Sequence, residues 1–366
     1  MTDVSAVVVG SGPSGCAAAL ALHERGHSVM LIGDSRVRRS WAGEALPPGA
    51  GDLVRSLFGE EALDSAVHRE AHGSQGAWGS DELVLTDFIA NPLGDGWHLD
   101  RGAFDAGLTE IVERRGVEVV RARATNPEPI GDGWRVEAAD RSITGAWLVD
   151  ASGRGGPLVP GAQSRRTRFD KQMALIAVAH AKPSALAYTT IEAVSDGWWY
   201  STPLPNGRAV VALMIDRDQA PPASERAIWW RVRLDQTRHI GGLVELDDKV
   251  AINAYPAETS CRKQLHGHNW AAVGDSAITW DPLSSQGTIT GILMGSRLGT
   301  AIADAADGDS AGMSEWERDY LMLLEEHLSL RQYYWEQEQR WPESKFWSRR
   351  CGQPGEDSLH GPLPEA

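Results

Sequence analysis

The chain has 366 residues, of which 42% are hydrophobic and 23% are charged, as in an ordinary globular enzyme. Its 50 acidic residues outnumber the 35 basic ones, and the formal charge of −15 disfavours nucleic acid or an anionic membrane surface as the main partner. No apolar run approaches the roughly 18 residues that a membrane span needs.

The N-terminal segment 6–32 predicts a strand, a tight turn, a helix and a second strand. Apolar residues run into Gly10-Ser11-Gly12-Pro13-Ser14-Gly15, and an alanine-rich segment follows. In Gly10-x-Gly12-x-x-Gly15 one glycine makes the turn, one lets backbone N–H groups approach a pyrophosphate, and one lets helix and strand pack closely. This context predicts dinucleotide binding at the positive end of the helix, rather than a merely structural turn.

The second strand lacks the acidic residue that usually binds the adenosine ribose. Gly33 occupies that position, and Asp34 follows one step later. Two alternatives remain open: Asp34 takes the role from a shifted register, or other groups hold the ribose hydroxyls.

The rest of the first half alternates a long connection with regular elements. The connection is expected from Pro47-Pro48 to about residue 95, and a loop of this size in a compact domain is usually functional. The elements predicted after it are a helix and three strands, at 102–115, 117–121, 134–138 and 147–150. The turn at 131–133 is expected to join the first two strands.

Between residues 167 and 255 the pattern changes to alternating strands. We expect them at 173–179, 187–193, 198–203 and 209–215, with a helix near 224–237. Asn206-Gly207 is a strong hairpin signal. The fold class predicted is α/β: an FAD-binding type of Rossmann domain from 1–166 and 256–310, with an inserted antiparallel-sheet substrate domain at 167–255.

Helices dominate the C-terminal part. One is predicted at 286–306, rich in small residues and so suited to close packing, and a long amphipathic one at 315–340. The segment 311–366 is therefore expected to be helical with a tail. The three cysteines, Cys16, Cys261 and Cys351, show no metal-binding spacing, so we expect reduced thiols, no metal site and a cytoplasmic location.

Three separated segments are suited to one elongated dinucleotide. They are the opening loop, the turn Asp150-Ala151-Ser152-Gly153-Arg154, and Gly274-Asp275 followed by the loop 281–287. A carboxylate at the end of an apolar strand can accept hydrogen bonds from sugar or ribityl hydroxyls. A loop that opens a helix at Gln286-Gly287 points free N–H groups at negative charge.

These three motifs resemble the FAD-dependent monooxygenases of the para-hydroxybenzoate hydroxylase type, and within that superfamily the branch of tryptophan halogenases and geranylgeranyl reductases. Further stretches resemble the flavoproteins that mature quinone-cofactor oxidases by oxygenating a tryptophan of a partner protein. Those stretches are 43–48, 96–101, 197–203, 281–287 and 340–342 with Phe346-Trp347. The resemblance covers nearly the whole chain.

The resemblance implies roles for particular residues. The pyrophosphate would lie on the opening loop, the ribityl chain beside Asp275, and the isoalloxazine beside the loop 282–287. The cofactor-binding residues expected in this way are Gly10, Gly12, Pro13, Ser14, Gly15, Asp34, Glu44, Arg101, Asp150, Gly153, Gly274, Asp275, Pro282, Ser285, Gln286 and Gly287. Among these, Asp150 and Gly153 are expected to shape a turn rather than to reach the reacting ring.

Comparison with the halogenases of this superfamily argues against halogenation. Those enzymes need a lysine downstream of the Gly-Glu pair, and no lysine lies between Glu44 and Arg101 here. Their Trp-x-Trp-x-Ile-Pro signature is altered to Trp198-Trp199-Tyr200-Ser201-Thr202-Pro203. Strand alternation sends Trp198 and Tyr200 to one face and Trp199 to the other, and these rings form either a substrate wall or inter-domain core.

The resemblance thus implies an FAD-dependent monooxygenase that hydroxylates an aromatic ring, most simply the indole of a free, peptide-borne or protein-borne tryptophan. Oxygen would come from O2 through a flavin C4a-hydroperoxide, and electrons from NAD(P)H or a separate flavin reductase. Glu192, Trp198 and Tyr200 are the candidate catalytic residues, with His72 as another candidate base. The alternatives are a reductase of an isoprenoid-like molecule, a halogenase, and a non-catalytic FAD-binding partner.

Overall fold

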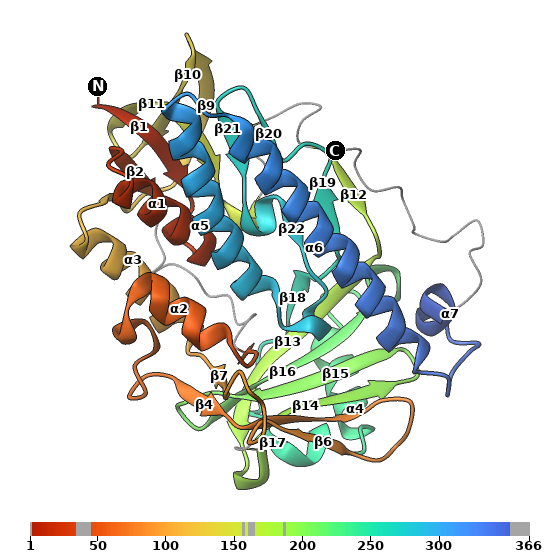
Figure 1. The fold of residues 1–366 in the computed structure, drawn as a ribbon. Coiled ribbons are helices and arrows are strands. Elements are labelled where there is room, and N and C mark those ends of the chain that lie inside the picture. Colours follow the sequence, from red (N-terminus) through yellow and green to blue (C-terminus); the bar gives the residue numbers. More distant parts are fainter. Residues whose placement is uncertain (1, 34–44, 156–157, 160–164, 186–187, 352–366) are drawn as a thin grey trace.

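The computed structural model describes residues 2–33, 45–155, 158–159, 165–185 and 188–351 (Figure 1). Asp34, Glu44 and the tail 352–366 lie outside the described residues. Within the described part, no helix is both long and apolar enough to cross a membrane.

A mainly parallel sheet forms the first half of the molecule. Its central strand β1 (Thr2–Val9) lies between β11 (Arg141–Asp150) and β2 (Val29–Ile32), and all three run in parallel. The strands β21 (Trp270–Ala272) and β8 (Glu118–Val120) extend the sheet in parallel on either side, and β20 (His266–Gly267) closes one edge in antiparallel fashion. Because parallel strands end at one edge, the loops after β1, β11 and β21 meet there. The Rossmann-type prediction is confirmed.

Two helices cover this sheet and pack against each other through glycines. The helix α1 (Pro13–Glu24) lies beside α5 (Gly287–Ala306), as Figure 1 shows. A Cβ atom added at Gly295 would lie 2.3 Å from the carbonyl oxygen of Ser14, and one at Gly299 would lie 2.6 Å from that of Ala18. The close packing predicted from the small residues is therefore present, and it fixes the N-terminal ends of both helices near one another.

An antiparallel sheet forms the second half and confirms the strands predicted there. Its order is β17 (Val244–Glu245), β13 (Gln172–Ala181), β16 (Arg208–Asp216), β15 (Gly197–Pro203), β14 (Thr189–Val194), β5 (Gly73–Ala77) and β6 (Val84–Asp87), with β18 (Asn253–Pro256) also on β13. The helix α4 (Arg226–Asp235) covers one face, close to its predicted position.

The long connection predicted up to residue 95 was wrong, because most of it is regular structure. It contains α2 (Ala50–Phe58), β4 (Arg69–Ala71) and the hairpin β5–β6. The strand β5 pairs in parallel with β14, with Ser74 opposite Thr189. We therefore propose to extend the substrate domain, expected at 167–255, by residues 73–87.

A further strand was missed next to the turn at 131–133. That turn joins β9 (Ala124–Ile130) to β10 (Gly133–Ala138), and not the strand β8 to β10. The strand β9 contains Pro127 and Pro129, residues that argue against a strand except at a sheet edge, where β9 lies.

The remaining elements are the predicted helix α3 (Arg101–Arg114) and two small sheets. One small sheet consists of β3 (Ala45–Leu46), β7 (Gly96–His98) and β4. The other consists of β12 (Arg166–Arg168), β19 (Ser260–Arg262) and β22 (Ile278–Thr279).

The C-terminal helices join the two halves. The helix α6 (Ala311–Glu336) begins and ends four residues before its predicted bounds, and α7 (Lys345–Cys351) follows it. The indole of Trp316 donates to the carbonyl oxygen of Met294 on α5 at 3.0 Å. At the other end, the indole of Trp347 donates to the carbonyl oxygen of Val194 in the antiparallel sheet at 2.7 Å. In Figure 1 α6 runs along both halves, which holds the sheets on either side of one cavity.

Candidate active site

One cavity of about 400 Å³ lies between the two halves. Its walls include Pro13 and Ser14 of the opening turn, and Gly274, Asp275, Pro282, Ser285, Gln286 and Gly287 of the later loops. The aromatic wall comes from Trp198, Tyr200, Tyr255 and Trp280. Segments predicted for a cofactor and segments predicted for a substrate therefore share one space.

The opening turn depends on glycines, because a side chain at these positions would clash with the backbone. Gly10 has φ +118°, and a Cβ atom there would lie 2.0 Å from the carbonyl oxygen of Ala151. A Cβ atom at Gly15 would lie 1.8 Å from the carbonyl oxygen of Gly10. Gly12 caps α1 without any side-chain hydrogen bond. Gly10 and Gly15 thus close the turn, and the first-turn N–H groups remain available to a ligand.

The N-terminus of α5 also lacks a side-chain cap, so its first-turn N–H groups are available to a ligand. Its N-cap residue, Gln286, makes no side-chain capping bond, and no acidic residue lies in its first turn. Ser285, just before it, has φ +52°. Two uncapped helix N-termini, with their positive dipole ends, therefore meet the cavity wall, and this arrangement fits a long anionic cofactor such as FAD.

The structure explains why an acidic residue is missing at the end of β2. A Cβ atom at Gly33 would lie 2.6 Å from the backbone nitrogen of Ser11 and 2.7 Å from its Oγ. A larger residue at this position would displace the opening turn. Asp34, the alternative ribose ligand, lies outside the described residues.

Asp150 is a structural residue rather than a cavity residue. It is fully buried and pairs with Arg262 at 3.0 Å, and its carboxylate also accepts hydrogen bonds from the Ser152 hydroxyl at 2.6 Å and from the Leu158 N–H at 3.0 Å. Gly153 has φ +71°. Both residues shape the turn after β11, as expected, and neither lines the cavity.

Two arginines line the cavity near Asp275 and the start of α5. Arg154 pairs with Asp275 at 3.0 Å. Arg101, at the start of α3, pairs with Asp105 at 3.0 Å and donates to the Thr288 hydroxyl at 3.3 Å. The structure thus places Arg101 and Asp275, both predicted from the sequence, on the same cavity.

The predicted alternation of the tryptophans on β15 is confirmed. Trp198 and Tyr200 line the cavity, whereas Trp199 packs on the opposite face against Trp230, with ring centroids 4.9 Å apart. The indole of Trp198 donates to Oε1 of Gln172 at 3.3 Å. Trp198 is therefore held in one orientation on the aromatic wall of the cavity.

The two candidate bases lie elsewhere. Glu192 faces away from the cavity and accepts backbone N–H groups of Arg238, His239 and Ile240 at 2.6 to 3.0 Å. Strand alternation sends its neighbour Ile191 into the cavity instead. His72 is exposed and pairs with Asp95 at 3.0 Å. The prediction that Glu192 or His72 acts as the base in this cavity is therefore wrong.

A buried carboxyl group that was not among the predicted site residues lies at the cavity. Asp281 is 1% exposed, its Oδ1 accepts the Leu283 N–H at 2.9 Å, and its Oδ2 has no hydrogen-bond partner. Burial raises the pKa of Asp281 above its usual value. Gln172 links it to Trp198, because the Gln172 amide donates to Oδ1 at 3.5 Å. The Asp281-Pro282 pair in the loop was the available signal.

A polar chain reaches the cavity from the opposite side. Nε2 of His98 lies 3.1 Å from the Thr189 hydroxyl, which lies 3.2 Å from that of Thr202, and both threonines line the cavity. Burial lowers the pKa of His98 to about 4, so its imidazole is neutral at neutral pH. Sequence inspection gave no signal for this chain, because its members come from three separate strands.

Together, the parallel sheet, the glycine turn and the shared cavity define a flavin-dependent oxidoreductase. The sequence model of the tryptophan halogenase family matches residues 84–361, and that of an FAD binding domain matches residues 5–47. The chain belongs to the tryptophan halogenase family of FAD-dependent enzymes.

Two proteins of known sequence resemble the chain over most of its length. LodB of Marinomonas mediterranea, assigned as an FAD-dependent oxidoreductase, is 27% identical over 96% of this chain and 97% of its own length. A 1H-pyrrole-2-carbonyl-[peptidyl-carrier protein] brominase of Pseudoalteromonas luteoviolacea is 24% identical over 83% of this chain and 78% of its own.

Solved structures share the fold. The peptidyl tryptophan dihydroxylase QhpG superposes with a TM-score of 0.81 and 23% identity over 98% of this chain and 81% of its own. The myxobacterial chondrochloren halogenase CndH superposes with a TM-score of 0.84 and 22% identity over 98% of this chain and 88% of its own. Both hydroxylases and halogenases thus use this architecture.

Proposed function

We propose that this protein is an FAD-dependent monooxygenase that hydroxylates an aromatic ring, the indole of a tryptophan that is free or carried by a peptide or protein. The observation that carries the proposal is the cavity between the two halves, in which uncapped helix N-termini and glycine turns face Trp198 and Tyr200. The likeness to QhpG, a peptidyl tryptophan dihydroxylase, supports the choice of substrate.

The residues present fit FAD along one wall. Gly10, Gly12, Ser14 and Gly15 would hold the pyrophosphate at α1, and Asp275 would bind the ribityl chain. Pro282, Ser285, Gln286 and Gly287 would lie beside the isoalloxazine, where the N-terminus of α5 stabilises negative charge. When bound, FAD supplies the chemistry that activates O2. Electrons come from NAD(P)H or a separate flavin reductase.

The chain's own residues would position the substrate and move a proton. Trp198, Tyr200, Ile176 and Met214 give an apolar wall that excludes water from an aromatic ring. Asp281 takes the role first considered for Glu192, because it combines a free Oδ2, a raised pKa and a place on the cavity. We assign it as the group that holds or transfers the proton during hydroxylation.

Halogenation is the second candidate, since the brominase and CndH are similar to this chain. Against it, the sequence has no lysine between Glu44 and Arg101, and no lysine is present among the described residues that line the cavity. Hydroxylation requires no such amine, and the geometry therefore favours it.

A product analysis tests the proposal. The FAD-loaded protein is reduced, mixed with O2 and bromide or chloride, and offered free tryptophan or a tryptophan-containing peptide. Mass spectrometry is expected to show added oxygen on the indole. Addition of a halogen would support the second candidate. Reduction of an added isoprenoid, or no O2-dependent product with any aromatic substrate, would favour the reductase or the non-catalytic partner.

A further inference from the structure

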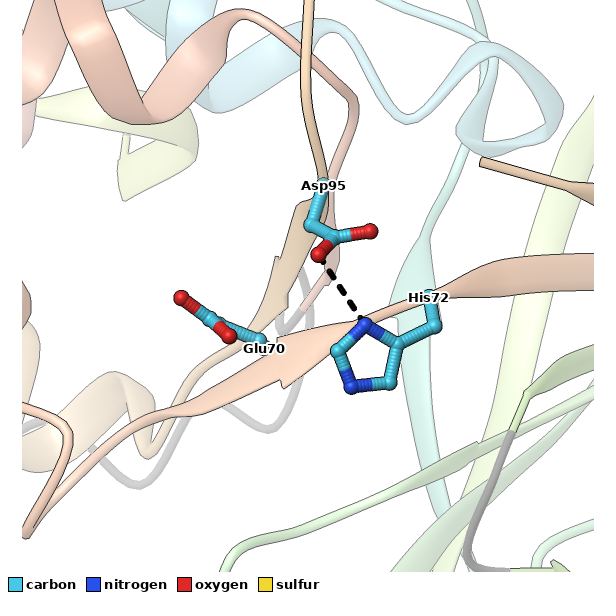
Figure 2. A group of neighbouring side chains, drawn as sticks. All are labelled: Glu70, His72 and Asp95. Atoms are coloured by element: carbon cyan, nitrogen blue, oxygen red, sulfur yellow. Dashed lines mark ion pairs between the residues drawn. The ribbon is translucent and has the colours of Figure 1, made fainter. Parts of the chain in front are cut away.

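A cluster of potential metal ligands lies outside the cavity, at the paired ends of β4 and β7, which precede α3. Glu70, His72 and Asp95 each offer one donor atom, and these atoms all lie within 4.8 Å of one another (Figure 2). The distance from Nδ1 of His72 to the Asp95 carboxylate is 3.0 Å.

The backbone brings these side chains together. Glu70 and His72 are two residues apart along an extended segment, so their side chains leave the same face. The strand β4 pairs with β7 in a register that sets Ala71 opposite Gly96, which brings Asp95 opposite His72. Glu70 lies in β4, and His72 and Asp95 each lie one residue beyond the paired ends of β4 and β7, so the pairing of these two strands sets the three donors side by side.

Charge also favours a cation at this point. A neutral imidazole leaves two carboxylates close together, and no described lysine or arginine forms an ion pair with Glu70. The simple His72–Asp95 ion pair leaves the Glu70 carboxylate without a counter-charge. A divalent cation neutralises both carboxylates at once.

The donor set indicates the kind of metal. Imidazole nitrogen with carboxylate oxygens suits Zn²⁺ and neighbouring transition metals, whereas Mg²⁺ and Ca²⁺ prefer oxygen ligands alone. Bond lengths of about 2.0–2.2 Å place neighbouring donors of a tetrahedral Zn²⁺ roughly 3.3–3.6 Å apart. The His72–Asp95 distance is close to this value, and the exposed Glu70 side chain is free to turn inward.

We propose that Glu70, His72 and Asp95 bind a divalent transition metal of the zinc class, with water completing the coordination. Bound metal cross-links the start of the β5–β6 hairpin to the segment that leads through β7 to Arg101 at the cavity. It thereby stiffens the place where the hairpin leaves the small sheet and joins the substrate sheet. This site does not rest on the proposed function.

Metal binding by the whole FAD-loaded protein, prepared without an affinity tag and stripped by a chelator, tests the proposal. Titration calorimetry with Zn²⁺ and the visible absorption of Co²⁺ are measured for the natural protein and for Glu70→Gln, His72→Ala and Asp95→Asn. His180→Ala is the matched control, because His180 is an exposed histidine that pairs with one carboxylate, Asp247, at 3.2 Å.

We expect one Zn²⁺ per chain, binding weakened at least about ten-fold by each of the three substitutions and unchanged by His180→Ala. Zn²⁺ should raise the melting temperature of the natural protein and of His180→Ala, but not of Glu70→Gln. Absence of saturable Zn²⁺ binding would overturn the proposal. Zn²⁺ binding that is unchanged in Glu70→Gln would also overturn it, because Glu70 would then not be a ligand and His72 and Asp95 would form only an ion pair.

Discussion

One wall of the cavity is formed mainly by backbone atoms, and the other is formed mainly by side chains. On the cofactor side the shape comes from the backbone, with Gly10 and Gly15 in contact with carbonyl oxygens and two helix N-termini left uncapped. On the substrate side it comes from side chains, with Trp198 held through Gln172. A wall formed by backbone atoms is rigid and tolerates few substitutions. A wall formed by side chains can be adapted to another substrate by substitutions on the same sheet.

The largest effect is expected from breaking the backbone wall. Gly10→Ala places a Cβ atom 2.0 Å from the carbonyl oxygen of Ala151, so the turn cannot keep its form, and the protein should lose FAD and most of its soluble yield. Gly26→Ala is the matched control, because Gly26 also has positive φ but no atom within 4 Å of the added Cβ. The control should lose only about 1 kcal/mol of stability. FAD content by absorbance separates the two, and equal retention would contradict a backbone-built site.

The junction of the two walls is tested at Asp281. Asp281→Asn keeps the size and the acceptor for Leu283 but cannot transfer a proton, so hydroxylation should fall about a hundred-fold or more while FAD content stays constant. Because burial raises the folded-state pKa of Asp281, the stability of the natural protein relative to Asp281→Asn should decrease as pH rises above the usual value of 3.8. Stopped-flow product formation and urea unfolding measure these effects. Glu192→Gln, which lies away from the cavity, should lower stability without changing the rate per folded molecule; a rate loss there would point back to Glu192.

The side-chain wall is tested by comparing the two faces of β15. Trp199→Ala empties a core position against Trp230 and should lower the free energy of unfolding by about 3–5 kcal/mol, with the product unchanged. Trp198→Phe removes the hydrogen bond to Gln172, which contributes only about 1 kcal/mol to stability, but it should change the turnover or the position of hydroxylation. Urea unfolding and product mapping distinguish the faces. The reverse pattern would mean that Trp198 is merely core.

The smallest effect is expected at His98, on the far side of the cavity. Its pKa is lowered to about 4 in the folded protein, so the unfolded chain takes up the proton first as pH falls from 6.5 toward 4. The free energy of unfolding should fall in that window by up to about 1.4 kcal/mol per pH unit. His98→Gln should reduce this slope but leave the part due to His327, whose pKa is lowered to about 3. Urea unfolding between pH 7 and pH 4.5 measures the slope, and an unchanged slope would show that folding does not lower the pKa of His98.

Features that depend on local backbone geometry were predictable from the sequence. The turn at Gly10, the opening of α5 after Gln286 and the opposite faces of Trp198 and Trp199 follow from residue spacing alone. Glu192 was misplaced because its carboxylate binds a distant turn at 238–240, which spacing along β14 does not reveal. The hairpin β5–β6 was missed because its strand partner, β14, comes more than a hundred positions later in the chain.

The sequence by itself predicted a dinucleotide site formed by a glycine turn and a later Gly-Asp strand end, because both depend on backbone conformations that few residues adopt. Only the tertiary structure decided which carboxyl group faces the cavity, how Gly33 excludes a larger side chain, and where Glu70, His72 and Asp95 meet. Burial and cross-strand pairing join residues far apart in the chain, and these contacts, rather than composition or spacing, set the chemistry of a side chain.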